Sequence, residues 1–514
     1  MKSLDFLLLI SPQKPFLRPF DVFYPFSHQQ DKNFLPLSNG GLSLLGVLNE
    51  EFEVGFHDLA HFKYLKKSSL RETVENVIKK YNPKIVGLHC YTFNFNGMKE
   101  TLKYIKEINE NIITIAGGQH VTFQDEESIK ECNGNLDIVV RGEGEKIIYN
   151  LINALIKNKP LKNVRGITTD SFKTVDELPL TTEELNSLPN PLFSAIPIEE
   201  RKSLIYYPIN SSRGCSYRCL FCVNHEFWIG GVRFMDPEKV ISTINDLYDC
   251  FKHKRIFMDF TDTILPLHLE KFKDLVNLYT SEINQPIYFA LTRANYTDDE
   301  RLMLIKRLIQ DVGVLSIGVE NGNNEVLRIM RKPSWEKQLQ ALKNIRKFKM
   351  KLTPSWLIGH PGETLSTMVE NLQKIDFLFN NKLIDTLIPF IWVPLPGTPP
   401  FENPDKYHVK IISYDWDRYD RAIYLPPYHL LDPFDHNKIA LSNQQIWAYF
   451  LGVISLCNKN STNFNFKEVH ERITFDQFLT RVKNDHLYTL FSPGKDGDIN
   501  YYPDLDQFLV PQET

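Results

Sequence analysis

Three cysteines near the middle of the chain have a spacing that suits a metal centre. The stretch SSRGCSYRCLFC, residues 211–222, places Cys215, Cys219 and Cys222 in a C-x3-C-x2-C pattern. Thiolates bind iron–sulfur clusters or zinc, but a zinc site normally has four protein ligands and paired C-x2-C elements. Only one such triplet occurs in this sequence. The pattern favours an iron–sulfur cluster with one open iron over three cysteines that bind no metal.

The residues around the cysteines suit a shielded cluster. Gly214 permits a tight backbone turn, and Phe221 and Val223 supply apolar cover, with Phe221 as a cofactor-binding residue. The triplet resembles the cluster loop of the radical S-adenosylmethionine (SAM) enzymes. The resemblance implies a 4Fe-4S cluster whose open iron chelates the amino and carboxylate groups of SAM. One electron then cleaves SAM to methionine and a 5′-deoxyadenosyl radical.

Length and composition describe a globular protein of several domains. The 514 residues allow two to four domains, and 42% hydrophobic residues, 24% charged residues and a net charge of −4 show no polybasic field for nucleic acid. Seven cysteines without a paired framework indicate a reducing compartment, so we expect a cytoplasmic protein. The apolar run FLLLI (6–10) is too short for a membrane span. We therefore expect neither a nucleic-acid partner nor a membrane.

Residues 1–160 alternate apolar runs with amphipathic segments. FLLLI (6–10), IVGLHC (85–90), IITIAGG (112–118) and LDIVVRGEGE (136–145) read as buried strands, and GMKETLKYIKEI (97–108) as a crossover helix. This rhythm predicts an α/β fold, with a Rossmann-like, doubly wound parallel sheet. Ligands of such sheets bind at the carboxyl ends of the strands.

The predicted strand ends carry small and polar residues, in CYTFN (90–94), AGGQH (116–120) and RGEGE (141–145). Such residues are also ordinary turn chemistry. Taken together, however, these segments resemble the cobalamin-binding domain that precedes the radical module in one branch of radical SAM enzymes. The resemblance implies that the cobalamin is lined by Gly41, Thr92, Phe93, Asn94, Gly117, Gly118, Gln119, His120, Gly142 and Glu143.

One motif of many cobalamin proteins is absent. The sequence has no D-x-H-x-x-G, which supplies a lower axial histidine. The resemblance therefore implies base-off cobalamin without a histidine ligand; the alternative is a domain that has lost its cofactor. His57, His61 and His89 lack ligand spacing, and we expect them to be ordinary surface or core histidines.

A proline-rich segment, residues 161–204, predicts a semi-rigid linker between two domains. The βα rhythm then resumes over 205–400, with amphipathic helices between the strands. The expected strands end near 260, 292, 320, 359 and 395, and a further strand precedes the cysteines. Successive units of this kind predict a partial (β/α)6 barrel with its active site at the strand carboxyl ends.

Polar residues follow each barrel strand. Glu320 could accept two ribose hydroxyls and Arg293 could pair with a carboxylate, although each taken singly could be a solvated rim charge. The ordered motifs GVENG (318–322) and GHPGET (359–364) resemble the radical SAM core of the cobalamin-binding branch. The resemblance assigns Glu320 to the SAM ribose and Arg293 to the methionine carboxylate.

The same resemblance places Asp262, as a catalytic residue, and Thr263 in the cavity shared by cofactors and substrate. Two positions depart from the family pattern. Asn321 stands where Ser is usual, and Thr261 stands where a second Asp is frequent. Either departure could reshape the cavity.

Residues 401–514 carry no motif, and we expect a mainly helical region that caps the barrel. We expect a helix over 437–456, and an aromatic stretch precedes it. The aromatics Trp416, Tyr419, Tyr424 and Tyr428 could contact an organic substrate; alternatively they pack this region against the barrel.

The resemblance implies a cobalamin-dependent radical SAM enzyme that methylates an unactivated carbon or phosphorus centre of a small molecule or peptide. An electron donor such as flavodoxin or ferredoxin would reduce the cluster, and we expect a monomer. Two alternatives remain open. One is cyclisation or ring rearrangement without methyl transfer, and the other is a non-catalytic cobalamin or iron–sulfur sensor.

Overall fold

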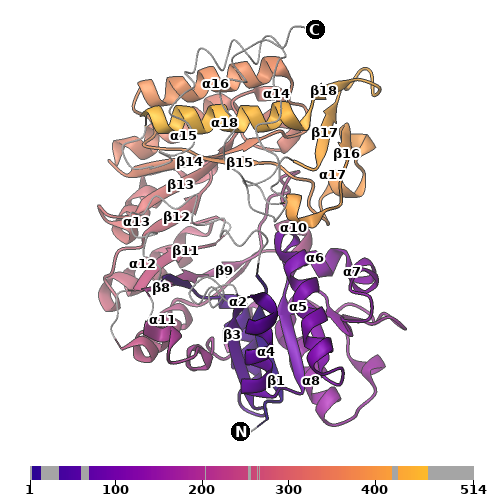
Figure 1. Ribbon diagram of the computed structural model, residues 1–514. Coiled ribbons are helices and arrows are strands. Elements are labelled where there is room, and N and C mark those ends of the chain that lie inside the picture. Colours follow the sequence, from indigo (N-terminus) through magenta and orange to yellow (C-terminus); the bar gives the residue numbers. More distant parts are fainter. Residues whose placement is uncertain are drawn as a thin grey trace.

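Two lobes make up the protein (Figure 1). The computed structural model describes residues 3–12, 34–59, 69–202, 204–252, 256–262, 264–265, 267–419 and 426–460. His61, Thr263, Tyr424 and the tail beyond residue 460 lie outside the described residues. The N-terminal lobe contains one sheet, and the following lobe contains a second, curled sheet with helices on its outer side.

The N-terminal sheet has the order β3-β1-β4-β5-β6-β7. Its strands are β1 (Phe6–Ile10), β3 (Val54–Asp58), β4 (Ile85–His89), β5 (Ile113–Gly117), β6 (Ile138–Val140) and β7 (Ile167–Thr168). The first five are parallel, and β7 pairs antiparallel with β6. The direction of winding reverses between β1 and β4, so the predicted doubly wound sheet is confirmed. In such a sheet the crevice at the reversal is the expected ligand site.

Amphipathic helices cover this sheet. They are α2 (Asn39–Leu48), α4 (Leu70–Tyr81), α5 (Phe95–Ile108), α6 (Gln119–Phe123), α7 (Asp125–Glu131) and α8 (Gly144–Ile156). In α4, Val74, Val77 and Ile78 recur at helical spacing and are buried, and Ser69 caps the first turn by accepting from the Glu72 amide. The apolar periodicity therefore decides which face of the helix meets the sheet.

The second sheet has the order β15-β14-β13-β12-β11-β8-β2, and all its neighbouring strands are parallel. The strands are β2 (Phe34–Pro36), β8 (Leu204–Ile209), β11 (Ile256–Phe260), β12 (Phe289–Thr292), β13 (Val314–Glu320), β14 (Lys351–Ile358) and β15 (Ile388–Ile391). The six strands of the predicted partial barrel are confirmed, and β2 adds a seventh. The burial of every residue of β11 and β13 explains their continuous apolar runs.

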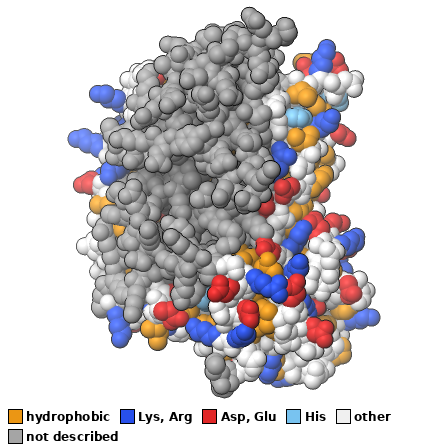
Figure 2. Space-filling model, in the orientation of Figure 1, with side chains coloured by type: hydrophobic (Ala, Val, Ile, Leu, Met, Phe, Trp, Pro, Cys, Tyr) orange, Lys and Arg blue, Asp and Glu red, His pale blue; other side chains and the backbone are white. Residues whose placement is uncertain are grey.

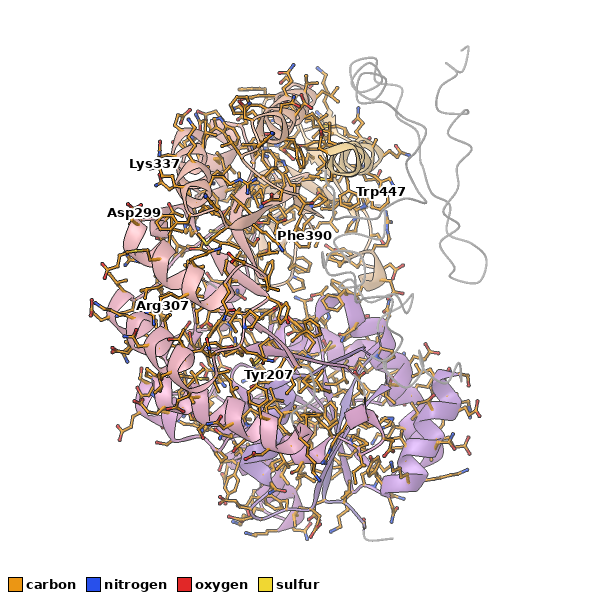
Figure 3. The ribbon with its side chains drawn as sticks, turned by 90° about the vertical axis from the view of Figure 1, so that its left-hand side faces the viewer. Tyr207, Asp299, Arg307, Lys337, Phe390 and Trp447 are labelled. Atoms are coloured by element: carbon orange, nitrogen blue, oxygen red, sulfur yellow. The ribbon has the colours of Figure 1, made fainter. Side chains whose placement is uncertain are left out.

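The barrel helices lie outside the curled sheet. They are α11 (Pro237–Phe251), α12 (Leu269–Glu282), α13 (Asp299–Ile309), α14 (Asn324–Met330), α15 (Trp335–Lys347) and α16 (Leu365–Asn380). Figure 3 shows Asp299, Arg307 and Lys337 on this outer layer. In Figure 2, Lys and Arg are interspersed with Asp and Glu over the visible, described part of the N-terminal lobe.

Two strands connect the lobes in a way that the sequence did not indicate. β2 lies in the barrel sheet, although it falls within the residues expected in the N-terminal domain. β7 lies in the N-terminal sheet, although it falls within the expected linker. The chain therefore passes from β1 to the barrel at β2 and returns to the first lobe at α2.

The described C-terminal region is less helical than expected. An antiparallel sheet of β16 (Val409–Ile411), β17 (Tyr428–Leu431) and β18 (Ile439–Leu441) precedes α18 (Asn443–Asn460). These strands are too short to show an alternating pattern, which is why the sequence did not reveal them. Among the described residues, no helix combines the length and apolar character needed to cross a bilayer.

The aromatic residues of this region pack against two partners. Trp416 contacts the N-terminal lobe, with its ring centroid 4.7 Å from that of His120 and 6.3 Å from that of Phe95. Tyr428 packs against the barrel, since its hydroxyl donates to the Gly359 carbonyl at 2.7 Å. The expectation of packing against the barrel alone was therefore incomplete, because this region joins both lobes.

Candidate cofactor-binding site

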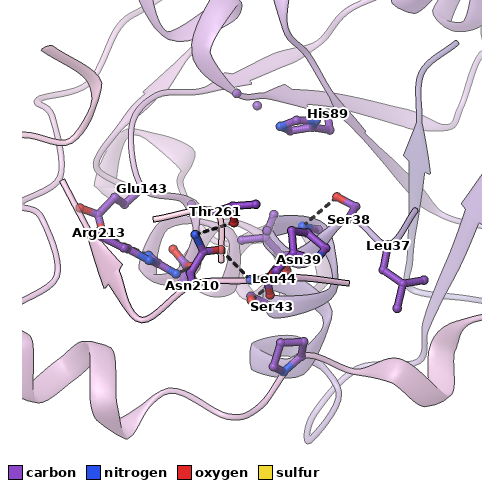
Figure 4. Close-up of a pocket in the computed structure, with 18 of the residues that line it drawn as sticks. Leu37, Ser38, Asn39, Ser43, Leu44, His89, Glu143, Asn210, Arg213 and Thr261 are labelled. Atoms are coloured by element: carbon purple, nitrogen blue, oxygen red, sulfur yellow. Dashed lines mark hydrogen bonds and ion pairs between the residues drawn. The ribbon is translucent and has the colours of Figure 1, made fainter. Parts of the chain in front are cut away.

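A cavity of about 690 Å³ lies between the two lobes. Its walls come from the carboxyl ends of β1, β4, β5 and β6 and from β8, β9 (Ser212–Arg213) and α11 on the barrel side. Figure 4 shows Glu143 and Arg213 together on one side of it, and His89 across from Asn39 and Asn210. The cavity thus occupies the place where ligands of open α/β sheets bind.

Eight of the ten residues expected around cobalamin line this cavity. They are Gly41, Phe93, Asn94, Gly117, Gly118, Gln119, Gly142 and Glu143. Thr92 and His120 are buried behind the wall, where the His120 Nδ1 and the Thr92 Oγ1 are 3.2 Å apart. Burial lowers the pKa of His120 to about 3, so this imidazole is neutral. These two side chains support the lining loop from behind.

Glycines in the cavity wall let neighbouring segments pack more closely than a side chain at the same position would permit. Gly118 has a φ of 121°, and a Cβ built there would lie 2.4 Å from the Cys90 carbonyl oxygen. A Cβ at Gly41 would lie 2.7 Å from Leu8 Cδ2. The loops after β4 and β5 therefore meet without intervening side chains, which leaves space for a large cofactor above them. This geometry fits the cobalamin that the sequence implies.

His89 is a cavity residue that the sequence analysis treated as ordinary. It ends β4, lines the cavity, and meets the Tyr91 ring edge to face, with 4.4 Å between ring centroids. Burial lowers the pKa of His89 to about 4, so the ring is neutral near pH 7. Its place at the end of the strand beside the reversal in winding was the signal that could have revealed it.

The cysteine loop is closed at its base by a short hairpin. β9 pairs antiparallel with β10 (Arg233–Phe234), and the loop of residues 214–232 lies between them. Gly214 has a φ of 91°, and a Cβ there would lie 2.2 Å from the Gly231 carbonyl oxygen. Only glycine fits where these two backbone segments meet, so Gly214 determines where the cysteine loop starts, at Cys215.

The three cysteines all lie on this loop. Cys215 is buried, Cys219 and Cys222 are partly buried, and the Cys222 amide donates to the Cys219 carbonyl at 3.0 Å. In the described parts of the chain, no three His, Cys, Asp or Glu side chains converge on a point where one metal ion could bind. A 4Fe-4S cluster does not require such convergence, because each cysteine binds a different iron. The donor set therefore fits a cluster better than a single ion.

Arg293 is not a solvated rim charge. Its Nη1 lies 3.3 Å from the Cys219 Sγ, and its guanidinium carbon lies 3.8 Å from the centroid of the Tyr217 ring. The residue is 6% exposed. Its guanidinium therefore donates directly to one of the predicted cluster ligands.

Glu320 ends β13 in a strained conformation. Its φ is 72°, at a register shift between β13 and β14. The Ser355 hydroxyl donates to its Oε2 at 3.2 Å, and the Lys332 Nζ lies 3.5 Å from its Oε1. A Cβ on Gly318 would lie 2.6 Å from that same Oε1, so a side chain there would displace the carboxylate. Lys332 belongs to no motif recognised in the sequence, so the sequence did not reveal it as a site residue.

Asp262 is buried, and protein groups engage its carboxylate. The Ser211 amide lies 3.0 Å from each of its oxygens, and the Ser212 hydroxyl donates to one of them. Burial raises the pKa of this carboxyl group. These bonds tie Asp262 to β9, immediately before the cysteine loop.

The remaining predicted positions lie around the barrel mouth. Thr261 lines the cavity and accepts from the Asn210 side chain at 3.2 Å. Asn321 is fully buried, donates to Glu363 at 2.7 Å and is not among the residues that line the cavity. The Phe221 ring packs edge to face against His360, with 6.1 Å between centroids.

Two family models match the chain at the two lobes. The B12 binding domain matches residues 40–152, and the Radical SAM superfamily matches residues 209–375. An uncharacterized methyltransferase of Pyrococcus horikoshii is 26% identical over 71% of this chain and 78% of that protein. An anaerobic magnesium-protoporphyrin IX monomethyl ester cyclase of Rubrivivax gelatinosus is 25% identical over 62% of this chain and 58% of its own length.

A solved structure shares the architecture. The radical SAM methyltransferase TsrM of Kitasatospora setae, with cobalamin and a [4Fe-4S] cluster bound, superposes with a TM-score of 0.63 at 14% identity. The match covers 94% of this chain and 96% of that one. Fold and site thus define a protein that pairs a B12-binding sheet with a radical SAM barrel. The chain belongs to the cobalamin-binding radical SAM enzymes, whose cofactors are a 4Fe-4S cluster, SAM and cobalamin.

Proposed function

We propose that this protein is a cobalamin-dependent radical SAM methyltransferase that acts on an unactivated carbon or phosphorus centre of a small molecule or peptide. The observation that carries the proposal is the cavity between the lobes. It brings the strand ends of the B12-binding sheet against β9, which leads directly into the cysteine loop. The methyltransferase relative in Pyrococcus horikoshii supports this choice of reaction.

The protein holds and orients the reacting groups. Cys215, Cys219 and Cys222 bind the cluster, and Arg293 places positive charge beside Cys219. Glu320 offers two carboxylate oxygens to the ribose hydroxyls of SAM. When bound, the cofactors supply one-electron cleavage of SAM and a transferable methyl group. The contribution of the chain is to keep these groups within reach of one another.

The cavity wall also controls solvent. Phe93, Phe227 and Trp228 contribute aromatic surface to the wall, and Leu8 and Ile115 contribute aliphatic surface. Water near a radical reaction would open side reactions, so an apolar wall protects the chemistry.

A second candidate reaction is oxidative cyclisation without methyl transfer. The observation that favours it is the match to the magnesium-protoporphyrin ester cyclase, which extends over 62% of this chain. A third, non-catalytic reading is a cofactor sensor, which predicts cofactor binding without turnover of SAM. Beyond the reaction itself, we propose a cytoplasmic, monomeric enzyme that is reduced by a flavodoxin or ferredoxin.

The test is anaerobic reconstitution with iron, sulfide and hydroxocobalamin, followed by SAM and a chemical reductant. Bound cobalamin, together with 5′-deoxyadenosine and cobalamin-dependent S-adenosylhomocysteine, supports the methyltransferase. 5′-Deoxyadenosine alone supports the cyclase. Bound cofactors without 5′-deoxyadenosine support the sensor. Cys219→Ala should abolish SAM cleavage, whereas Cys250→Ala, on α11, should not.

A further inference from the structure

Four buried charged residues join the B12-binding lobe to the hairpin that carries the cysteine loop. We propose that Glu143, Glu145, Arg213 and Arg233, here called the interlobe clamp, are positioning residues that hold the cluster loop at a fixed place relative to the cobalamin cavity. This inference rests on the proposed function, because its consequence concerns two cofactors that work together.

The clamp consists of three close ion pairs. The Arg213 Nη2 lies 2.5 Å from the Glu145 Oε1, and its Nη1 lies 3.2 Å from the Glu143 Oε2. The Arg233 Nη1 lies 2.5 Å from the Glu143 Oε1. One guanidinium therefore bridges two carboxylates, and one carboxylate bridges two guanidinium groups. Such bridging restricts orientation as well as distance.

The positions of these residues give the clamp its function. Glu143 and Glu145 follow β6 at the carboxyl edge of the B12-binding sheet, whereas Arg213 and Arg233 occupy paired positions in β9 and β10. Arg213 immediately precedes Gly214 and Cys215. A displacement of Arg213 would therefore move the start of the cluster loop. Arg233 also donates to the Leu180 carbonyl at 2.7 Å, so the clamp is hydrogen-bonded to the linker segment as well.

Because the clamp is buried, its charges must be paired with one another. The four side chains are between 5% and 11% exposed, and two positive charges balance two negative ones. Apolar residues of similar size could stabilise a lobe interface as well as buried ion pairs do. Ion pairs add a defined geometry, which fits a site where two cofactors must face each other.

The clamp changes the role expected for Glu143. The residue lines the cavity, as the family resemblance implies, but both of its carboxylate oxygens lie against arginines. Arg213 lines the cavity too, beside Trp228, whose ring centroid is 5.4 Å from the guanidinium carbon. Glu143 therefore holds the cavity wall in place, and its carboxylate is paired with the two arginines of the clamp.

The first test uses the apoprotein, so that it does not depend on the proposed reaction. Glu145→Gln and Arg213→Lys should raise hydrogen exchange in residues 214–232 and 141–145 at least several-fold. Asp385→Asn is the matched control, because it weakens a two-bonded arginine pair, with Arg346, outside the clamp. Unchanged exchange in both clamp variants, or an equal rise in the control, overturns the proposal.

The second test uses the reconstituted protein. In the fraction of each clamp variant that carries both cofactors, electron paramagnetic resonance should show a weaker magnetic interaction between the reduced cluster and cob(II)alamin. A role in stability alone would leave that interaction unchanged in the folded fraction, and this result would overturn the inference. A wild-type protein that binds no cobalamin would refute the proposed function instead, while the exchange experiment still decides the clamp.

Discussion

The Lys332 Nζ lies 3.5 Å from the Glu320 Oε1 inside the barrel, where the lysine side chain is 4% exposed. The two residues belong to different elements: Glu320 ends β13, and Lys332 follows α14. The absence of a side chain on Gly318 makes room for both, since a Cβ there would lie 2.9 Å from the Lys332 Nζ. We interpret Lys332 as the residue that holds the Glu320 carboxylate in place at the end of β13, where we propose that it binds the SAM ribose.

Replacing Lys332 with Met should weaken SAM binding at least tenfold, because Glu320 would lose its counter-ion and its position. Lys332→Arg should retain part of the affinity. Equilibrium binding of SAM to the cluster-loaded protein measures the effect. Lys337→Met, on the outer layer in Figure 3, is the control and should bind normally. Equal affinities for the Lys332 and Lys337 variants would remove Lys332 from the site.

Asp262→Ala should lower the iron content of the reconstituted protein by half or more. The substitution removes the acceptor of the Ser211 amide and of the Ser212 hydroxyl, and each lost bond costs about 1–3 kcal/mol when a buried donor is left unpaired. Asp376→Ala on α16 is the control, with iron content unchanged. Full iron content with no product would instead show that Asp262 acts in catalysis.

Gly118→Ala should weaken hydroxocobalamin binding at least tenfold. The new Cβ would lie 2.4 Å from the Cys90 carbonyl oxygen, and the φ of 121° would add strain of about 1–3 kcal/mol. Titration followed by the visible spectrum measures the affinity. Gly134→Ala has a φ of 79° but open space around its Cβ, so it separates backbone strain from the clash. We expect Gly134→Ala to bind cobalamin like the wild type.

Buried histidines should make the apoprotein less stable as the pH falls below about 6.5. Burial lowers the pKa of His120 and of His360 to about 3 and that of His89 to about 4, so between these values and the ordinary histidine pKa only the unfolded chain takes up their protons. Glu363 opposes the effect, because burial raises its pKa to about 7 and the folded state then binds its proton first. Each proton taken up net on unfolding removes roughly 1.4 kcal/mol per pH unit.

Urea denaturation at pH 7.5 and pH 5.5 measures this dependence. The double variant His120→Gln with His360→Gln should weaken the dependence on pH, because His89 still contributes to it while Glu363 acts in the opposite direction. Identical pH dependence in the variant and the wild type would show that other groups control acid stability.

Local patterns in the sequence were enough to predict most of the architecture. Continuous apolar runs predicted β1, β4, β5 and β6 of the first sheet and β11 to β15 of the second, because a strand buried on both faces must be apolar along its length. The C-x3-C-x2-C spacing identified the cluster loop, because the three ligands lie within eight residues, Cys215 to Cys222, on one loop. Strand-end residues such as Gly118 and Glu320 were singled out by the family resemblance, which assigns them to cofactors at the carboxyl ends of the strands.

Only the tertiary structure determined the features that depend on contacts between distant segments of the chain. Lys332 and Arg233 have no recognisable pattern around them, and each acquires its role only when another strand end brings a carboxylate within reach. Strand β2 joined the barrel because its backbone pairs with β8, a partner that lies about 170 residues away in the chain. Trp416 likewise contacts the N-terminal lobe through residues that are distant in the sequence, Phe95 and His120. Burial and charge pairing between remote segments are properties of the folded chain, and no local spacing encodes them.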